Sequence, residues 1–372
     1  MLLVGFSLEY FVFTRNWLRL LIVSVLSIVI FAIIVGIDYF AQTAAIEIRS
    51  GSVTAVDHEE EWDEWHPEVC TTTTDDKGRT STSCTPGYWE HHDATNRIKT
   101  SDDGWITVRK SMDGKVKFND SYPNTDSELA YFYPIGTTSA SRHTYTNKVK
   151  ASYSIFKNKE VNPDDYPYLP SYPNTVEGYI KIPRFIGDVP NKVQVLDRLD
   201  ELNTRLNKMV PNPEKPGKLK SWKEVNLIFV NLGADVPYEA GLALQDSWEN
   251  GNKNDFVVSF SADSSGRIAW AYAFSWSEVD ILKLEVQDLL MNNGDTADFL
   301  TIIDGVGNLV EEKFERKQFA DFNYIQVQPS NLAIGFIWFL EVTLVVGYFI
   351  NGLYSTREEL RRKGSKSRYS WI

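Results

Sequence analysis

Leu18–Phe40 reads LRLLIVSVLSIVIFAIIVGIDYF, and Leu332–Tyr354 reads LAIGFIWFLEVTLVVGYFINGLY. Each stretch is close to the length of about 20 apolar residues with which a helix crosses the hydrocarbon core of a bilayer. The two stretches predict transmembrane helices over residues 18–40 and 332–354. The residues between them are then expected to lie on one side of a membrane.

The charges beside the two spans predict their orientation. Arg15 and Arg19 stand at the start of the first span, and residues 355–372 form a basic tail. Short segments rich in lysine and arginine remain in the cytoplasm. We therefore expect an inner-membrane protein with cytoplasmic termini, a cytoplasmic or interfacial segment at residues 1–17, and a periplasmic or extracellular centre. A cleaved signal peptide is the alternative for the first span, but the apolar run is about twice as long as a signal core.

The net charge argues against one class of partner. The chain of 372 residues carries a formal net charge of −12 although its C-terminal tail is basic, so the central region holds the acidic excess. Such a surface repels the phosphates of nucleic acids. We therefore expect a lipid bilayer as a partner and no nucleic acid, while cationic partners and divalent metal ions stay compatible with the charge.

The only two cysteines, Cys70 and Cys84, are separated by the polar stretch TTTTDDKGRTSTS. In an oxidising compartment two thiols that close such a loop are expected to pair, which restricts the unfolded chain by about 3 kcal/mol on the loop-entropy estimate. Neither belongs to a C-x-x-C motif, so a zinc ribbon or a thioredoxin-like site is disfavoured. We predict a disulfide that clamps a surface hairpin.

All histidines fall in the first half of the central region, among many acidic residues. The two segments that flank the disulfide could form a metal site, but their spacing matches no ligand signature such as HExxH. We interpret them as a hydrated acidic surface above packed tryptophans, and we assign no metal ligands. The residues concerned are His58, His66, His91, His92 and His143, with Glu59, Glu60, Glu61, Asp63, Glu64, Glu90, Asp93, Trp62, Trp65 and Trp89.

The central region divides into three parts. Residues 41–160 predict a small β-rich module: an Asp113-Gly114 turn separates two strand-like runs, and ELAYFYPIG (128–136) and HTYTNKVKASYSIF (143–156) continue the pattern. Residues 161–190 are rich in proline and predict an extended connector. Residues 191–325 alternate helical and strand-like patterns.

The third part predicts an open α/β sheet. Apolar residues recur every three or four positions from Asn191 to Met209, which indicates an amphipathic helix. Strands at 225–232, 256–262 and 268–276 and helices at 238–250, 277–292 and 296–316 follow. This order predicts one sheet with helices on its faces. The fold class is therefore an α+β membrane-anchored protein with two transmembrane helices flanking both modules.

Residues 185–321 resemble the TPM domain family. The matching features are a Gly-Asp pair before the long helix, a core strand, a tryptophan passage before the next strand, an Arg-Ile pair and a late Gly-Asp pair. They read Ile186-Gly187-Asp188, NLIFVNL (226–232), Gln245-Asp246-Ser247-Trp248 with Gly251-Asn252-Lys253-Asn254-Asp255, Arg267-Ile268 with Tyr272, and Asn293-Gly294-Asp295-Thr296-Ala297. The resemblance implies a TPM-type α/β domain over roughly residues 191–325.

The chain departs from the family at one important place. In the family's R-I-E-x-G-x-G segment an acidic residue and glycines help form a pocket associated with divalent cations and, in some members, phosphatase activity. Here Ala269, Ala271 and Ala273 occupy those positions. A hard cation would lack one oxygen ligand. The resemblance therefore implies the fold more strongly than the activity.

Four polar residues remain where the resemblance places that pocket: Asp188, Asn254, Asp255 and Arg267. They could line a residual polar cleft at the carboxyl ends of the strands, where open α/β sheets bind ligands. Alternatively Asp188 caps the helix that follows it, and Asn254 and Asp255 form a turn. We favour the structural interpretation and assign no catalytic residue.

Glu341 lies near the middle of the second span. An ionised carboxylate there costs on the order of 2.5 kcal/mol or more. The first span offers only Ser24 and Ser27 as hydrogen-bonding groups. We expect Glu341 to be protonated or to contact a basic or polar residue of another membrane protein. A hydrogen bond within the pair of spans is the alternative.

Two functions follow from these observations. The first is a non-enzymatic structural or accessory subunit, without a cofactor, that associates with itself or with another membrane protein through its spans. The alternative is a phosphatase-like hydrolase of the TPM family that depends on Ca²⁺ or Mg²⁺. Ala269 and Glu341, together with the added aromatic β module, favour the first.

Overall fold

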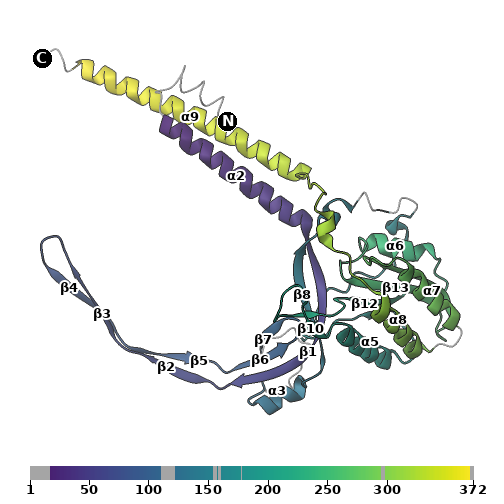
Figure 1. Cartoon of the computed structure of the whole chain (residues 1–372). Coiled ribbons are helices and arrows are strands. Elements are labelled where there is room, and N and C mark those ends of the chain that lie inside the picture. The colour runs from purple at the N-terminus through teal and green to yellow at the C-terminus, as the bar shows by residue number, and fades with distance from the viewer. Residues whose placement is uncertain are drawn as a thin grey trace. The chain divides into compact units, whose positions relative to one another are not determined.

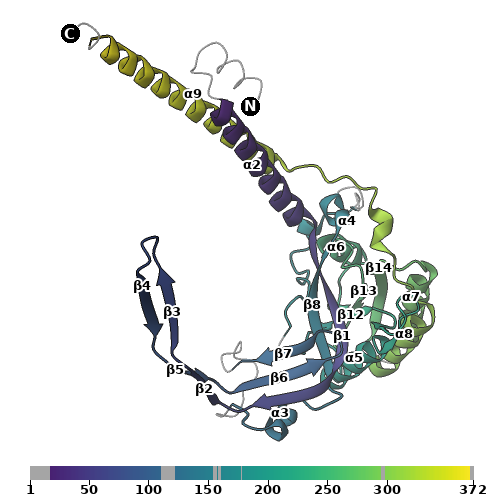
Figure 2. The same ribbon diagram turned by 60° about the vertical axis from the view of Figure 1, so that its left-hand side comes forward.

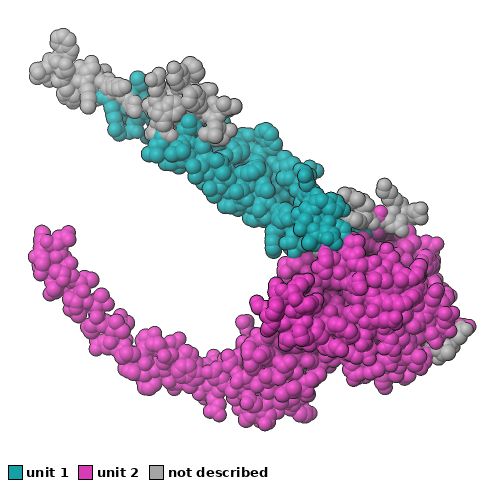
Figure 3. All heavy atoms as spheres, in the orientation of Figure 1, with its two compact units in different colours: residues 1–45, 146–156, 319–372 teal, residues 46–145, 157–318 magenta. Residues whose placement is uncertain are grey.

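The computed structural model describes residues 17–109, 122–153, 157, 161–176, 178–294 and 298–368. It is a mixed α+β structure with a curled sheet and two long apolar helices (Figure 1). The chain divides into two compact units, which Figure 3 distinguishes by colour. Unit 1 comprises Met1–Ala45, Thr146–Phe156 and Phe319–Ile372, and unit 2 comprises Ile46–Tyr145 and Lys157–Gln318.

Unit 1 contains both long helices, α2 (Trp17–Thr43) and α9 (Asn331–Arg368). Each is long and apolar enough to cross a membrane, over Leu20–Thr43 and Asn331–Arg362. Many of their large apolar side chains are exposed. The exposed ones include Leu21, Ile22, Val25, Ile28, Phe31, Ile33, Ile37 and Phe40 of α2, and Leu332, Phe336, Trp338, Phe339, Val342, Val346, Ile350 and Leu353 of α9.

A hydrogen-bonded cap fixes the start of α9. Asp38, near the end of α2, accepts hydrogen bonds from the backbone N–H and the hydroxyl of Ser330, at 2.9 and 2.6 Å. The Ser330 hydroxyl in turn accepts from the backbone N–H of Ala333 at 3.1 Å, which satisfies one of the free donors of the first helical turn. Unit 1 also holds the short helices α4 (Lys148–Ala151) and η3 (Phe319–Phe322).

The first part of unit 2 is a four-stranded sheet in the order β7-β6-β1-β8. Its strands are β1 (Ala44–Glu59), β6 (Thr95–Thr100), β7 (Gly104–Val108) and β8 (Thr138–Thr146). One face packs against α3 (Asp126–Phe132) through a core that includes Val53, Ile98, Val108, Leu129 and Tyr133. The β-rich character predicted for this part is confirmed.

The prediction that ELAYFYPIG continues the strand pattern is wrong, because this stretch forms α3. Thr125 caps the helix by accepting a hydrogen bond from Glu128 N at 3.2 Å, and the Glu128 carboxylate accepts one from Asn124 N at 2.8 Å. Such reciprocal capping is a helix-start signal that outweighs aromatic strand propensity. In HTYTNKVKASYSIF only HTYT lies in β8, and KVKA forms α4. The expected Asp113-Gly114 turn lies outside the described residues.

A two-stranded arm extends the sheet (Figures 1 and 2). Its first ribbon pairs β2 (Trp62–His66) with β5 (Tyr88–His92), and its second pairs β3 (Val69–Thr74) with β4 (Thr80–Thr85). Every residue of β3 and β4 is exposed, so no apolar core holds this ribbon together. An isolated hairpin of this kind is marginally stable in water. Its strands therefore need another form of support.

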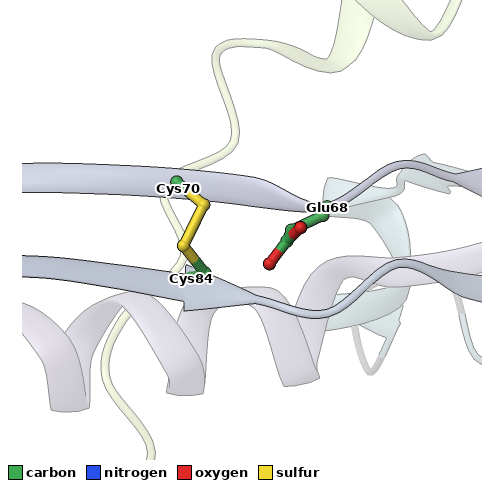
Figure 4. A group of neighbouring side chains, drawn as sticks. All are labelled: Glu68, Cys70 and Cys84. Atoms are coloured by element: carbon green, nitrogen blue, oxygen red, sulfur yellow. A yellow bond between two sulfur atoms is a disulfide. The ribbon is translucent and has the colours of Figure 1, made fainter.

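That support includes the predicted disulfide, which is confirmed. Cys70 and Cys84 are opposite each other in the register of β3 and β4, with their Cα atoms 4.0 Å apart, and their sulfurs are bonded (Figure 4). Glu68 lies beside the pair. Because both sulfurs belong to the disulfide, neither is a thiolate that could join Glu68 in binding a metal.

The second part of unit 2 is a sheet in the order β14-β13-β12-β9. Its strands are β9 (Phe185–Ile186), β12 (Asn226–Asn231), β13 (Asp255–Ala262) and β14 (Ile268–Ser275). The first three are parallel and β14 is antiparallel to β13. The helices are α5 (Lys192–Leu206), α6 (Glu239–Ser247), α7 (Ile281–Asn293) and α8 (Phe299–Lys313). The predicted order holds for α5, β12, α6, β13, β14, α7 and α8, whereas β9 before α5 was not predicted.

Both faces of this sheet are covered. Leu227 and Phe229 of β12 face the core made with α5, α7 and α8, whereas Ile228 and Val230 face α6 and the proline-rich connector. Strands buried on both sides read as continuous apolar runs, as β12 and β13 do. The connector contains the single turn η2 (Pro163–Asp165), and a short hairpin of β10 (Met209–Pro211) and β11 (Leu219–Ser221) follows α5.

Candidate functional site

The four residues expected to line a polar cleft lie near opposite ends of the strands of the α/β sheet. Asn254 and Asp255 stand at the amino end of β13. Asp188 follows β9, and Arg267 immediately precedes Ile268, which pairs with the last residue of β13. An eight-residue strand is roughly 23 Å long. The structure therefore does not gather these residues into one cleft.

Asp188 and Arg267 are surface residues. The Asp188 side chain is fully exposed and pairs with Lys192 at 3.1 Å. It makes no cap: helix α5 begins after Asn191, and no side-chain hydrogen bond caps it. Arg267 pairs with Asp263 at 3.1 Å across a turn, where hydrogen bonds from Ser265 and Arg267 lower the pKa of Asp263 to about 2. Solvent-exposed pairs of this kind contribute about 0–1 kcal/mol to stability.

Asp255 is completely buried and accepts three hydrogen bonds. The donors are Asn226 Nδ2 at 2.9 Å, the Tyr172 hydroxyl at 3.1 Å and the backbone N–H of Asn252 at 2.7 Å. Burial raises the pKa of Asp255 to about 6, and the three donors oppose that rise. Asp255 thus joins strand β13 to the connector, which contributes Tyr172.

The same network continues through Arg184, whose side chain is 2% exposed. Its Nε donates to Asn226 Oδ1 at 3.0 Å, Nη1 to Asp200 Oδ1 at 2.9 Å, and Nη2 to Ser50 Oγ at 2.6 Å. Because Asn226 contacts both Arg184 and Asp255, one buried polar network runs along the amino ends of β12 and β13. Ser50 belongs to β1, so the network also joins the two sheets of unit 2.

A pocket of about 320 Å³ lies at the edge of this network. The Glu47 side chain of this pocket is buried, with 1% exposed. Its carboxylate lies 3.0 Å from Lys253 Nζ and 2.5 Å from Arg49 Nη2. Burial alone would raise the pKa of Glu47, but Lys253 and Arg49 lower it below its usual value. The pocket is lined by Glu47, Arg49, Ser50, Ser101, Asp102, Asn207, Met209, Leu219, Lys220, Ser221, Glu224, Lys253, Asn254 and Arg316.

The contacts of these residues join neighbouring elements of unit 2. Glu224 pairs with Arg316 at 2.5 Å, and Glu47 is neutralised as described above. Asn254 donates from Nδ2 to the Ile48 carbonyl at 2.6 Å, which fastens the start of β13 to β1. Four of the charged side chains of the lining, besides Glu47, are thus engaged: Arg49 and Lys253 with Glu47, and Glu224 with Arg316.

One serine–histidine pair occurs elsewhere in the curled sheet. Ser141 Oγ lies 2.9 Å from His143 Nε2, and Asp103 lies 3.8 Å from the same nitrogen. A catalytic triad requires the nucleophile and the carboxylate on different ring nitrogens. Ser141 is also buried, so a substrate could not reach its hydroxyl. The pair therefore has a structural role.

Glu341 finds its partner within the pair of long helices. The Ser27 hydroxyl of α2 donates a hydrogen bond to Glu341 of α9. Leu20 and Tyr348 are buried in the same contact between the helices. The alternative that the sequence left open, a hydrogen bond inside the pair, is the arrangement that the structure has.

This contact gives a first prediction. Replacing Glu341 with leucine removes the acceptor for Ser27, and such bonds between membrane helices contribute about 0.6 kcal/mol on average, up to about 1.7. In detergent, the ratio of separated to paired helices is expected to rise about threefold, with a limit near 20-fold. The measurement is chemical cross-linking between Leu20→Cys and Tyr348→Cys.

Two variants serve as controls for this cross-linking. Glu341→Gln keeps an oxygen acceptor for Ser27 and is expected to retain most of the wild-type yield. Val342→Leu changes an exposed neighbour and is expected to have no effect. An unchanged yield in Glu341→Leu would show that the hydrogen bond does not hold the helices together.

No protein-family model, curated protein or solved structure matches this chain.

Proposed function

We propose that the protein is a membrane-anchored, non-enzymatic accessory subunit of a membrane complex, with a TPM-like domain outside the membrane. The observation that carries the proposal is the outward-facing apolar surface of α2 and α9, which nothing in the described chain covers. Apolar surface of that extent needs lipid or another membrane protein around it. The flanking positive charges favour cytoplasmic termini.

The disulfide supports the placement of unit 2. Cys70 and Cys84 are bonded in an arm whose residues are exposed to solvent. Structural disulfides persist in oxidising compartments such as the periplasm or the cell exterior. The proposal therefore places the arm and both sheets of unit 2 on that side of the membrane.

The surroundings of the candidate polar residues, as far as the structure describes them, support the non-enzymatic part of the proposal. Asp255 is occupied by three hydrogen bonds inside the protein, while Asp188 and Arg267 form solvated surface pairs. At the position of the family's carboxylate, Ala269 is exposed and offers no ligand. Ala271 and Ala273 pack into the apolar core. The TPM-like domain then contributes shape and contacts to a complex.

The test is the size and the activity of the protein solubilised in a mild detergent. We expect light scattering, corrected for detergent, to give a protein mass well above the 42.5 kDa of one chain. We also expect no phosphatase turnover with Ca²⁺ or Mg²⁺. A monomer that also forms no cross-links in native membranes would contradict the proposal. Metal-dependent turnover lost in Asp188→Ala, whose exposed side chain is not needed for folding, would support the hydrolase instead.

A further inference from the structure

The first ribbon of the arm gathers histidines and glutamates on one face. Side chains alternate between the faces of a strand, and directly paired residues share a face. In the register of β2 and β5, Trp62 pairs with His92, Glu64 with Glu90, and His66 with Tyr88. We call these six residues the His–Glu face.

Two carboxylates occupy the centre of the His–Glu face. Glu64 and Glu90 are directly opposite each other across the ribbon. Like charges in that position destabilise a pair of strands. The ribbon is exposed and has no apolar core that could offset the repulsion. A positive charge between the two carboxylates would turn the repulsion into an attraction.

The ring nitrogens of both histidines point at these carboxylates. His66 Nε2 lies 2.8 Å from Glu90 Oε2 and 3.8 Å from Glu64 Oε2, and His92 Nε2 lies 3.3 Å from Glu64 Oε2. Ligands bound tetrahedrally to Zn²⁺ at 2.0–2.1 Å are about 3.4 Å from one another. The ligand atoms of Glu64, His66 and Glu90 all lie within 4.8 Å of one another. His92 lies outside that group and approaches it through Glu64, so its ring has to move inward to become the fourth ligand.

Aromatic rings support the two histidines from the same face. The His92 ring stacks on Trp62, with centroids 4.2 Å apart and planes 13° apart. The His66 ring stacks on Tyr88, with centroids 4.8 Å apart and planes 19° apart. Neighbours that orient a ligand imidazole strengthen metal binding. The stacking therefore holds both Nε2 atoms toward the glutamates before any ion arrives.

We propose that the His–Glu face binds one first-row divalent metal ion, Zn²⁺, through His66, His92, Glu64 and Glu90. Two imidazole nitrogens and two carboxylate oxygens suit a borderline metal such as Zn²⁺, whereas Ca²⁺ requires six to eight oxygen ligands. The ion joins β2 to β5 in the first ribbon, as the disulfide joins β3 to β4 in the second. Each ribbon of the arm then has one cross-link between its two strands.

The test is metal content of the full-length protein in detergent, purified with a tag that contains no histidine. The protein is loaded with Zn²⁺, dialysed against metal-free buffer and analysed by mass spectrometry of the metal. We expect about one zinc per chain. His66→Ala and His92→Ala are each expected to weaken zinc binding at least about tenfold, since changes even to outer-shell partners cost that much.

His91→Ala is the matched control. His91 is adjacent to His92 on β5 but lies on the other face, where it contacts Asp63 at 2.7 Å. We expect it to retain zinc at the wild-type level. Addition of zinc should slow the amide hydrogen exchange of β2 and β5 in the wild type. In His66→Ala the same addition should leave the exchange unchanged. A wild type that retains no zinc, or a loss in His91→Ala as large as in His66→Ala, would overturn the proposal.

Discussion

Arg184→Met is expected to lower the free energy of unfolding by about 3–5 kcal/mol, because it breaks a buried ion pair from one side. The guanidinium is the partner of Asp200, Asn226 and Ser50. Burial already raises the pKa of Asp200 despite the adjacent Arg184. Without the arginine this carboxylate loses its hydrogen-bonded cation, and only the weaker attraction of Lys181 offsets its burial. The measurement is urea unfolding of the full-length protein in detergent, followed by tryptophan fluorescence.

Arg198→Met is the matched control for this experiment. Arg198 also pairs with two carboxylates, Asp304 at 2.7 Å and Glu201 at 3.0 Å, but its side chain is 40% exposed. Surface pairs contribute about 0–1 kcal/mol, so this variant should unfold close to the wild type. Equal effects of the two substitutions would show that the buried network does not hold the two sheets of unit 2 together.

The stability of the wild type is expected to fall by about 2 kcal/mol relative to Asp255→Asn as the pH rises from 4 to 7. The folded pKa of Asp255 is about 6, raised from 3.8 by burial. Between these two values the folded state binds more protons than the unfolded state, so stability is lost as the pH rises. Above about pH 7 the carboxylate is ionised in both states and the difference is nearly constant.

The asparagine variant isolates this titration. Its Oδ1 can still accept from Asn226 and Tyr172, whereas its NH₂ group would face the Asn252 N–H, which adds a cost that does not depend on pH. The other carboxylates titrate equally in both proteins and cancel in the difference. Denaturant unfolding of both at several pH values gives the comparison. Two parallel curves would contradict the raised pKa of Asp255.

The parts of the fold that follow from periodicity could be predicted from the sequence. Val195, Leu199, Leu202 and Leu206 recur at helical spacing, and all four are buried in the core of the α/β domain. The continuous apolar run of β12 is buried along its whole length. Helix α3 was missed because its aromatic residues favour strands, although the capping pattern of Thr125 and Glu128 indicated a helix.

The polar site was predictable only in part. Asp255 precedes the apolar run of β13, so it had to lie at the amino end of that strand, away from Arg267. Nothing in the local sequence marks Arg184 as buried, since its burial depends on Ser50, which is 134 residues away. A lone arginine in a proline-rich connector carries no periodic signal.

The His–Glu face did carry a signal in the sequence. Cys70 is opposite Cys84, and the same register continues without a shift to Trp62 opposite His92. Extending the register that the disulfide implies would therefore have paired Glu64 with Glu90. The spacing within one strand does not reveal this arrangement, because two of the four residues lie on β2 and the other two on β5.

The hydrogen bond between Ser27 and Glu341 has a consequence for biosynthesis, since 314 residues separate its two members. At about 5–20 residues per second, the ribosome makes the acceptor roughly 15–60 s after the donor. Under the proposed anchoring, the first helix waits alone in the lipid during that interval, which its uncharged sequence from Leu20 to Ile37 allows. Helix α9, which carries Glu341, is made after α2, so Ser27 is already in the membrane when Glu341 is made.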